Sequence, residues 1–382
     1  MKRQFPISLV ITSSLFWVVL PSLFNVACAQ VYDFAKENGG AIITGYHGPG
    51  GIVSIPREVE GVPVTGIGKA CFKPTGGALS ISTSYVNGTA ISRYVNYSVF
   101  VTCIIIPDSV KTIGASAFSH CTSLTNIIIP DSVTNIGYQV AEDCANLDAI
   151  TVDPGNSAYC SIDGVLFNKS HTWLIAFPEG RKKNTYSYMI PNGVTGIYLE
   201  SFEQCFCLTN ITIPGTVNRI ITSSLHIPSL VSIAVAANNP DFSSVDGVLF
   251  NKDKTIMLSY PCARTGRYTV PNSVVRIRKD AFFDCSGLTG ITIGNGVTNI
   301  EAGAFSSCRG LANIIVGDHV VDIGNAAFGN CPDLTGIYFM GAMPHFGYNV
   351  FNGSDKVVLY YLSDAKSWKR KVESRPAKVW KR

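Results

Sequence analysis

The sequence is poor in charge and in the residue sets that build catalytic centres. Only 15% of its 382 residues are Asp, Glu, Lys or Arg, and its six histidines are scattered, with no pair at the i, i+4 spacing of a zinc protease. It contains no Gly-x-Ser-x-Gly, P-loop, Gly-x-Gly-x-x-Gly or EF-hand motif. The sequence therefore predicts a protein that is not an enzyme and that holds neither a metal nor a cofactor.

Beyond residue 29 the chain has no uninterrupted apolar run of the roughly 18 residues that a membrane-spanning helix needs. Residues 1–29 differ from the rest, because Lys2 and Arg3 precede an apolar core and Ala27-Cys28-Ala29 supplies the small residues of a cleavage site. We expect residues 1–29 to be a cleaved signal peptide, and the protein to be secreted or held at the cell surface. Lipid attachment at Cys28 is the alternative.

Positive charge is concentrated at the two ends of the chain. Thirty Lys and Arg against 26 Asp and Glu give +4, but residues 365–382 hold eight cations and one anion, and the signal peptide holds two cations. The body therefore has 20 cations and 25 anions, a net −5, so we expect no nucleic-acid partner. We expect residues 366–382 to be a solvated basic tail; the alternative is that this tail binds an anionic surface.

A repeat of 23 residues runs through the rest of the chain. Two consecutive units read IIIPDSVKTIGASAFSHCTSLTN (104–126) and IIIPDSVTNIGYQVAEDCANLDA (127–149). The position after the apolar triplet recurs at 107, 130 and 153, at 191, 214 and 237, and at 271, 294, 317 and 340. A fixed period of this length, with Leu and Ile at set offsets, indicates a solenoid whose units bury their apolar sides against one another.

Each unit alternates apolar and polar residues as a strand does. The alternation places Leu124, Ile127 and Ile129 inward and Asn126 and Ile128 outward. Pro130 then ends the strand, and residues 115–120 are too few for more than one helical turn. We therefore predict an α/β repeat solenoid, arc-shaped, with parallel strands on the concave face, mostly strand and turn with single helical turns.

Two inserts interrupt the period. SIDGVLFNKSHTWLIAFP (161–178) and SVDGVLFNKDKTIMLSYP (244–261) are near copies, 83 residues apart, within the longer inserts 154–188 and 238–268. Two apolar runs around a polar centre are typical of a hairpin, and we read Asp-Gly as turn chemistry. We predict two inserted β-hairpins that stand off the stack and carry specificity.

These boundaries divide the chain into five parts. Residues 1–29 are the signal peptide, 30–103 an N-terminal cap with degraded first turns, 104–336 the repeat solenoid, 337–365 a C-terminal cap and 366–382 the basic tail. Within residues 30–103, we expect 73–103 to be one degraded turn with a surface loop. We expect the C-terminal cap to abandon the period and to cover the final coil with aromatic rings, namely Phe339, Phe346, Phe351, Tyr360 and Trp368.

The repeat pattern IxIPxSVxxIGxxAFxxCxxLTxI resembles the BspA-like class of leucine-rich repeats. The resemblance covers nearly the whole mature chain. It implies a leucine-rich-repeat solenoid of a secreted or surface-exposed bacterial protein that mediates protein binding or cell adhesion. It brings no catalytic residues to carry over.

One cysteine recurs at the same place in six units. The six are Cys121, Cys144, Cys205, Cys285, Cys308 and Cys331. A disulfide or metal ladder is one interpretation, and a column of buried thiols is the other. Parallel stacking separates neighbouring Cβ atoms by about 4.8 Å, whereas a disulfide needs roughly 3.8 Å. The mature chain also has 11 cysteines, an odd number, so we favour a structural column of thiols.

The outward strand positions are the candidate ligand-facing residues. They form a neutral surface of Asn126, Ile128, Asn210, Thr212, Gly290, Thr292, Asn313, Ile315 and Tyr338. We expect this concave sheet and the hairpin inserts to bind an extracellular or surface protein, with the protein itself a monomer. An extracellular carbohydrate-binding module is the alternative, and these residues are equally compatible with β-formers tolerated on an exposed sheet.

Overall fold

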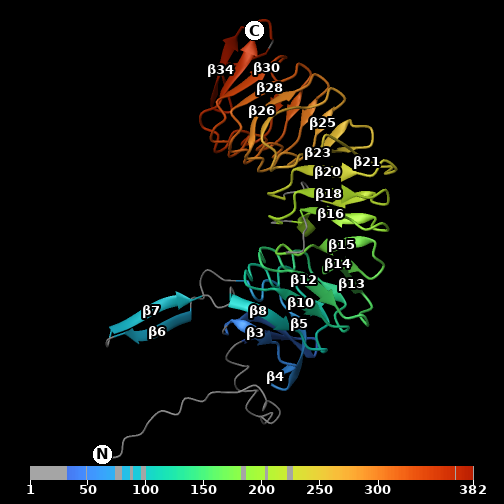
Figure 1. The fold of residues 1–382 in the computed structure, drawn as a ribbon. Coiled ribbons are helices and arrows are strands. Elements are labelled where there is room, and N and C mark those ends of the chain that lie inside the picture. The colour runs from blue at the N-terminus through green and yellow to red at the C-terminus, as the bar shows by residue number, and fades with distance from the viewer. Residues whose placement is uncertain are drawn as a thin grey trace, which may run out of the picture.

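The computed structural model describes residues 32–48, 50–73, 80–86, 89–95, 100–181, 186–202, 205–221, 227–365 and 367–381. The expected signal peptide, residues 1–29, lies outside this range. In the described residues nearly all regular structure is strand, with one 3-10 turn, η2 (Leu199–Phe202), and no α-helix. The chain winds into a curved stack of coils, which is a parallel β-solenoid (Figure 1). The predicted solenoid is confirmed, and the expected helical turns are for the most part hydrogen-bonded turns.

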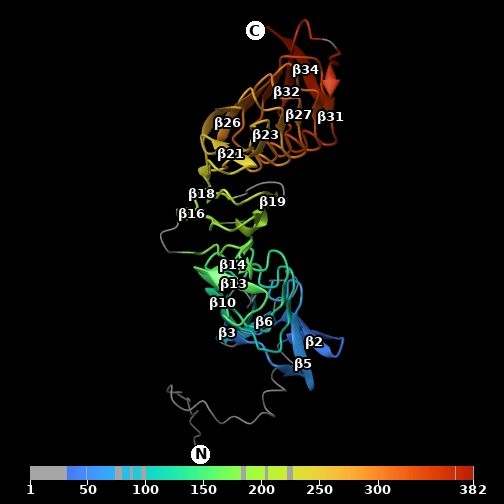
Figure 2. The same ribbon diagram turned by 90° about the vertical axis from the view of Figure 1, so that its right-hand side faces the viewer.

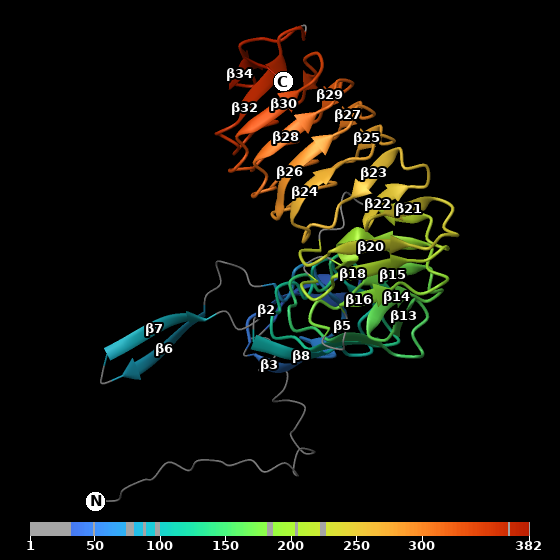
Figure 3. The ribbon, with the colours of Figure 1, turned by 45° about the horizontal axis from the view of Figure 1, so that its top comes forward.

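One strand of each coil joins a series that we call the inner sheets. Their orders are β12(Ala149–Val152)-β10(Asn126–Ile129)-β8(Val101–Ile105)-β3(Gly51–Ser54), β16(Ser187–Met189)-β18(Asn210–Ile213)-β20(Ser232–Val235), and β24(Gly266–Thr269)-β26(Leu288–Ile293)-β28(Asn313–Val316)-β30(Gly336–Phe339)-β32(Val358–Leu362)-β34(Arg375–Trp380)-β33(Lys371–Val372). The 23-residue period sets the register, so Asn126 lies opposite Ala149 and Asn313 opposite Gly336. At the C-terminal end these strands line the inner side of the arc (Figures 1 and 3).

A second strand of each coil joins the outer sheets. Their orders are β1(Tyr32–Glu37)-β2(Gly40–Tyr46)-β5(Val62–Ile67)-β9(Thr112–Ile113)-β11(Asn135–Ile136), with β4(Glu58–Val59) on β5, then β13(Tyr159–Ile162)-β14(Val165–Asn168)-β15(Trp173–Ala176)-β17(Gly196–Tyr198)-β19(Arg219–Ile221), and β21(Phe242–Val245)-β22(Val248–Asn251)-β23(Ile256–Ser259)-β25(Arg276–Ile277)-β27(Asn299–Ile300)-β29(Asp322–Ile323)-β31(His345–Phe346). Several of these strands can be followed in Figure 2. Nine of these 18 strands are only two or three residues long.

The side-chain alternation of the coils is as predicted. Leu124, Ile127 and Ile129 are buried, Ile128 is exposed and Asn126 is half-buried. β10 ends at Ile129, directly before Pro130, which lacks the N–H needed to continue the ladder. The apolar triplets of consecutive coils therefore stack on one another, as a solenoid requires.

The interior is divided into three blocks by the two inserts. Each insert is a three-stranded antiparallel meander, β13-β14-β15 and β21-β22-β23, whose last strand joins the parallel ladder. In β14, Leu166 packs in the core of residues 32–152, whereas Val165 and Phe167 pack in the core of the second block. In β22, Leu249 packs in that second core and Val248 and Phe250 in the third. β14 and β22 are therefore walls shared by neighbouring blocks.

The prediction that the inserts stand off the stack is wrong. Val165, Leu166 and Phe167 are all fully buried. A strand with apolar residues at consecutive positions is covered on both faces, and here a block of coils covers each face. Asp163 and Gly164 form the predicted turn, with φ of 49° and 77°.

The hairpin that does leave the solenoid lies elsewhere. β6 (Ser80–Val86) and β7 (Thr89–Val95) pair antiparallel and project away from the coils (Figures 1 and 3). This hairpin replaces the degraded turn expected over residues 73–103. Ser, Thr, Tyr and Asn in that stretch do not supply the apolar triplet that would tie it into the interior.

The C-terminal part differs from the prediction, because the coils continue through residues 337–365. β32 pairs parallel with β30, and β31 adds to the outer sheet. The described part of the expected tail, residues 367–381, is not a solvated end: β34 pairs parallel with β32, and β33 folds back antiparallel on β34. The alternation that buries Val372 and Ala377 is masked in the sequence by the intervening cations. The last strands are thus the cap, as β1 is at the other end, where it pairs antiparallel with β2.

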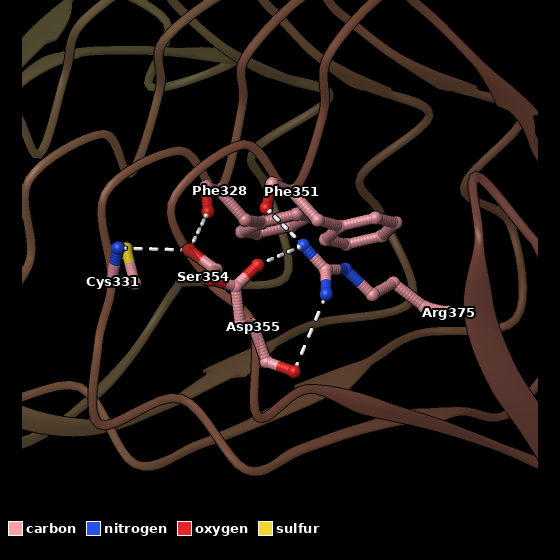
Figure 4. Close-up of polar contacts among 6 residues, drawn as sticks. All are labelled: Phe328, Cys331, Phe351, Ser354, Asp355 and Arg375. Carbon is pink, nitrogen blue, oxygen red and sulfur yellow. Dashed lines mark hydrogen bonds and ion pairs between the residues drawn. The ribbon is translucent and has the colours of Figure 1, made fainter.

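Arg375 shows how the basic end is held. Its guanidinium donates to the carbonyl oxygen of Phe351 at 3.0 Å and to Oδ1 of Asp355 at 2.8 Å (Figure 4). The side chain is only 18% exposed. A cation that satisfies a backbone carbonyl and a carboxylate at the end of the stack has a structural role there.

Candidate functional site

The candidate ligand-facing residues lie on three separate inner sheets. Asn126 and Ile128 are on β10, Asn210 and Thr212 on β18, and the others on β26, β28 and β30. Most are half-buried, Ile128 is exposed, and Gly290 is buried. They point away from the interior, yet they form three local surfaces in place of one continuous face, because the inserts interrupt the ladder.

The first of these surfaces is apolar. Ile52, Ile105 and Ile128 are 72%, 50% and 48% exposed on the adjoining strands β3, β8 and β10. We call these three residues the isoleucine patch. Sequence reasoning named only Ile128, although Ile105 occupies the same outward position one unit earlier. Large apolar side chains gathered on a solvent-facing sheet are a feature of interaction sites.

The third surface carries aromatic rings in register. Neighbouring strands of this sheet place four outward side chains opposite one another, in the order Thr292, Ile315, Tyr338 and Tyr360. The rings of Tyr338 and Tyr360 stack at 4.8 Å with 10° between their planes. Trp380 meets Tyr338 edge-on at 5.2 Å. Sequence reasoning placed Tyr338 here but missed Tyr360 and Trp380 as its neighbours, because it ended the repeat too early.

The tips of the inserts are the exposed parts of the two meanders. The exposed residues of the first tip are Lys169, Ser170 and His171. Those of the second tip are Lys252, Asp253 and Lys254. Both tips are held at their base in the same way, since Asn168 and Asn251 each accept a hydrogen bond from a backbone N–H five residues later at 2.8 Å. The tips are thus preorganised, and they differ in the number of charged side chains, one in the first and three in the second.

The six cysteines of the column are fully buried, and none forms a disulfide. Four of the thiols donate to the carbonyl of a phenylalanine in the preceding coil, as Cys144 does to Phe118 at 3.1 Å and Cys331 to Phe305 at 3.1 Å. Ser354 takes the next position, and its hydroxyl donates to Phe328 at 2.6 Å (Figure 4). Burial raises the pKa of the Cys121 thiol to about 12. These thiols therefore stay protonated and unreactive at neutral pH.

The residues that the structure describes hold no group of three or more His, Cys, Asp and Glu side chains arranged for a metal ion. Histidines instead meet single carboxylates, such as His120 with Asp143 at 2.9 Å and His47 with Asp33 at 2.6 Å. Within the same residues, no helix has the length and apolar character to cross a bilayer.

The repeat can now be compared with known families. The profile described as "BspA type Leucine rich repeat region" matches in six copies, over residues 89–183, 176–252 and 259–371. The chain belongs to this family. The family consists of repeat proteins, which fits the absence of catalytic motifs in the sequence.

Solved structures of bacterial leucine-rich repeat proteins are similar to this BspA-type chain. A leucine-rich cell surface protein of Faecalibacterium prausnitzii is 23% identical with a TM-score of 0.54, and the alignment covers 91% of this chain and 92% of that one. A leucine-rich repeat protein of Eubacterium ventriosum is 22% identical with a TM-score of 0.49, over 86% of this chain and 74% of that one. At this identity the likeness to the first supports the fold alone. No curated protein sequence matches the chain.

Proposed function

We propose that this BspA-type protein is exported and binds an extracellular or surface protein through its inner sheets. The isoleucine patch carries the proposal, because three large apolar side chains on adjoining strands are 48 to 72% exposed. A soluble protein gains nothing from exposing them unless a partner covers them. The signal-like composition of residues 1–29 and the surface location printed for the similar F. prausnitzii protein support export.

The patch suits a protein partner in shape and chemistry. Ile105 and Ile128 occupy outward positions on paired strands, so they present a ridged apolar surface. Thr151 extends it on β12 with a hydroxyl, and the half-buried Asn126 lies beside it. An apolar centre with polar neighbours is the usual anatomy of a protein interface.

Binding is tested by capture from an extracellular protein fraction with a double variant, Ile105→Lys and Ile128→Lys. A partner retained by the unaltered protein should be lost. Val275→Lys is the matched control, because Val275 is similarly exposed, at 44%, but precedes the outer strand β25. Equal retention by the double variant and the control would remove the patch from the interface.

Export is tested separately, by expression of the full chain in a bacterium and N-terminal sequencing of the exported product. A start at or near Gln30 is expected from the Ala27-Cys28-Ala29 site. Retention of residues 1–29 in the mature protein would contradict the proposal.

A glycan is the second candidate ligand, and the stacked Tyr338 and Tyr360 favour it. The stacked pair is half-buried on the inner sheet, and its ring edges can meet the C–H groups of a sugar while its hydroxyls supply hydrogen bonds. A glycan array with the unaltered protein and with Tyr360→Ala tests this candidate. Loss of binding in the variant would support it, and a blank array for the unaltered protein would exclude it.

A further inference from the structure

The inner sheet of the third block carries two unpaired cations at opposite ends. Arg267 lies on β24 and Lys378 on β34, and both are exposed. No hydrogen bond or ion pair joins either side chain to another residue that the structure describes. The order β24-β26-β28-β30-β32-β34 places five inter-strand spacings between the two residues, or roughly 24 Å at about 4.8 Å each. One small ion cannot reach both charges, whereas a chain-like ligand can.

The register of the strands puts both cations on the outward face of this sheet, whose strands can be followed in Figure 3. Arg267 lies opposite Gly290 on β26. The next residue, Ile291, is only 3% exposed and points inward, so Gly290 and Arg267 occupy outward positions. Lys378 lies opposite Tyr360, one of the two stacked rings. The cations and the stacked rings therefore share one surface.

Two glycines leave room for larger side chains to lie along this surface. A Cβ atom on Gly290 would be 3.5 Å from Cγ and 3.6 Å from Nε of Arg267. A Cβ atom on Gly336 would be 2.8 Å from Cε2 of Tyr338 and 3.1 Å from Oδ1 of Asn313. Both glycines are buried although they occupy outward positions, because these side chains cover them. The surface is therefore shallow and extended across the strands.

The charge of this surface is positive. None of the residues of β24, β26, β28, β30, β32 and β34 is Asp or Glu. Residues 266–382 together hold 14 Lys and Arg against nine Asp and Glu, a net charge of +5.

Most carboxylates in the turns beside these strands already have a basic neighbour. At 2.7, 3.6 and 2.8 Å from a basic side chain lie Asp318, Asp333 and Asp355. Asp364 and Glu373 are exposed at the end of the sheet, where residues 366–371 add four cations. The surface therefore favours an anionic ligand over a neutral or cationic one.

The residues between the cations suit a sugar chain better than a nucleic acid. Thr292 and Asn313 are half-buried polar residues that can exchange hydrogen bonds with sugar hydroxyls. The rings of Tyr338 and Tyr360 stack on each other at 4.8 Å, so the faces that they turn to each other cannot stack with a nucleic-acid base. Their edges and hydroxyls can contact the C–H and O–H groups of a sugar. An anionic glycan fits this combination of charges and neutral polar groups.

We propose that this surface binds a glycan chain that carries carboxylate groups, such as a polymer of uronic acids. The chain lies across the strands, with one carboxylate at Arg267 and another at Lys378. A guanidinium can bind a carboxylate through two parallel hydrogen bonds, which favours this anion at Arg267. The proposal rests on the second candidate function, a glycan ligand, and adds the charge of that ligand. The site is separate from the isoleucine patch, which lies on the first inner sheet.

The test is calorimetric titration of the purified protein with polygalacturonate and with alginate, each compared with its ester, at about 0.15 M ionic strength. An ester keeps the sugar backbone and removes the charge. We expect saturable binding of at least one polyuronate and at least tenfold weaker binding of its ester.

Three results would overturn the proposal. Equal affinity for the ester would remove the charge preference and leave the neutral glycan candidate standing. Equal affinity for poly-glutamate would assign the surface to acidic polymers of any backbone. Binding of neither polyuronate would exclude the acidic glycan, whereas failure of the glycan candidate itself would show as a blank glycan array.

Arg267→Gln with Lys378→Gln removes both cations and should weaken polyuronate binding at least tenfold while the circular dichroism spectrum is unchanged. Lys378→Gln alone decides the case if the double variant does not fold. Lys69→Gln with Lys111→Gln is the control, because it removes two exposed cations beside the outer strands β5 and β9 of the first block. The control should bind as the unaltered protein does. Equal loss in the two double variants, or no loss in the first, would overturn the proposal.

Discussion

The indole ring of Trp368 lies parallel to the ring of Tyr361, with 1° between their planes and 5.0 Å between their centroids. Trp368 also contacts Phe339 at 4.8 Å and donates its indole N–H to the carbonyl of Gly341 at 3.2 Å. The segment after residue 365 is thereby tied to β30 and β32. Three of its cations, Lys371, Arg375 and Lys378, lie on β33 and β34, which close the inner sheet.

Deletion of residues 366–382 should therefore destabilise the protein and promote its association. The deletion exposes the edge of β32, whose unpaired N–H and C=O groups are a template for another strand. Thermal unfolding and size-exclusion chromatography measure the two effects. Lys378→Gln with Lys381→Gln is the control, since it lowers the charge and retains the strand. A truncated chain that stays monomeric with an unchanged melting temperature would contradict the role of β34.

Leu166→Ala should lower the free energy of unfolding by about 2 to 5 kcal/mol, the usual cost of removing a buried leucine side chain. Leu166 is fully buried in the first core, and its strand separates that core from the second. Urea unfolding measures the change. Ile128→Ala, at an exposed site, is the control and should change stability by about 0.5 kcal/mol or less. Equal effects of the two substitutions would argue against a shared wall.

Thiol labelling of the chain without residues 1–29 should divide its 11 cysteines into two groups. Cys103, Cys160 and Cys207 are half-buried, and the remaining eight are buried. Burial and a pKa of about 12 for Cys121 suppress thiolate formation, so we expect at most three sites to react in the native protein and all 11 in denaturant. Mass spectrometry identifies the labelled sites. Rapid labelling of Cys308 or Cys331 in the native state would contradict the buried column.

Stability should fall as the pH rises above about 9. Burial raises the pKa of Cys121 from an ordinary value of 9.0 to about 12 in the folded protein. The unfolded chain therefore releases this proton first, and the thiol's contribution, fully present below pH 9, is lost between about pH 9 and 12. One such group changes the slope by up to about 1.4 kcal/mol per pH unit. Urea unfolding across this range should show a shallower slope for Cys121→Ala, and an identical slope would contradict the prediction.

Local patterns in the sequence predicted the coil correctly. Ile127 and Ile129 face the interior and Pro130 ends the strand, because strand alternation and the missing proline N–H act within a few residues. The period of 23 predicts the stacking register for the same reason. Both properties are repeated in every unit and need no knowledge of distant contacts.

The inserts and the C-terminal strand depend on contacts between distant residues. Val165, Leu166 and Phe167 give no alternation, which is compatible with burial on both faces, but the two blocks that cover them are not apparent from the insert alone. In residues 371–380 the cations conceal the inward positions of Val372 and Ala377. The charge run therefore suggests a solvated end of the chain, whereas the structure places it at one edge of the sheet.

The candidate ligand-facing surfaces likewise could be predicted from the sequence only where they depend on local alternation. Outward positions such as Ile128 follow from alternation, whereas the neighbourhood of Tyr338, Tyr360 and Trp380 depends on where the repeat ends.

The double-faced strands β14 and β22 also bear on how such a molecule can evolve in length. Each ends one compartment and begins another, and their matching segments are 83 residues apart. A tandem duplication of that segment would lengthen the protein by one whole block of coils. Each shared strand would still have a block packed against both of its faces. Growth by compartments would add recognition area in fixed increments and leave both end caps undisturbed.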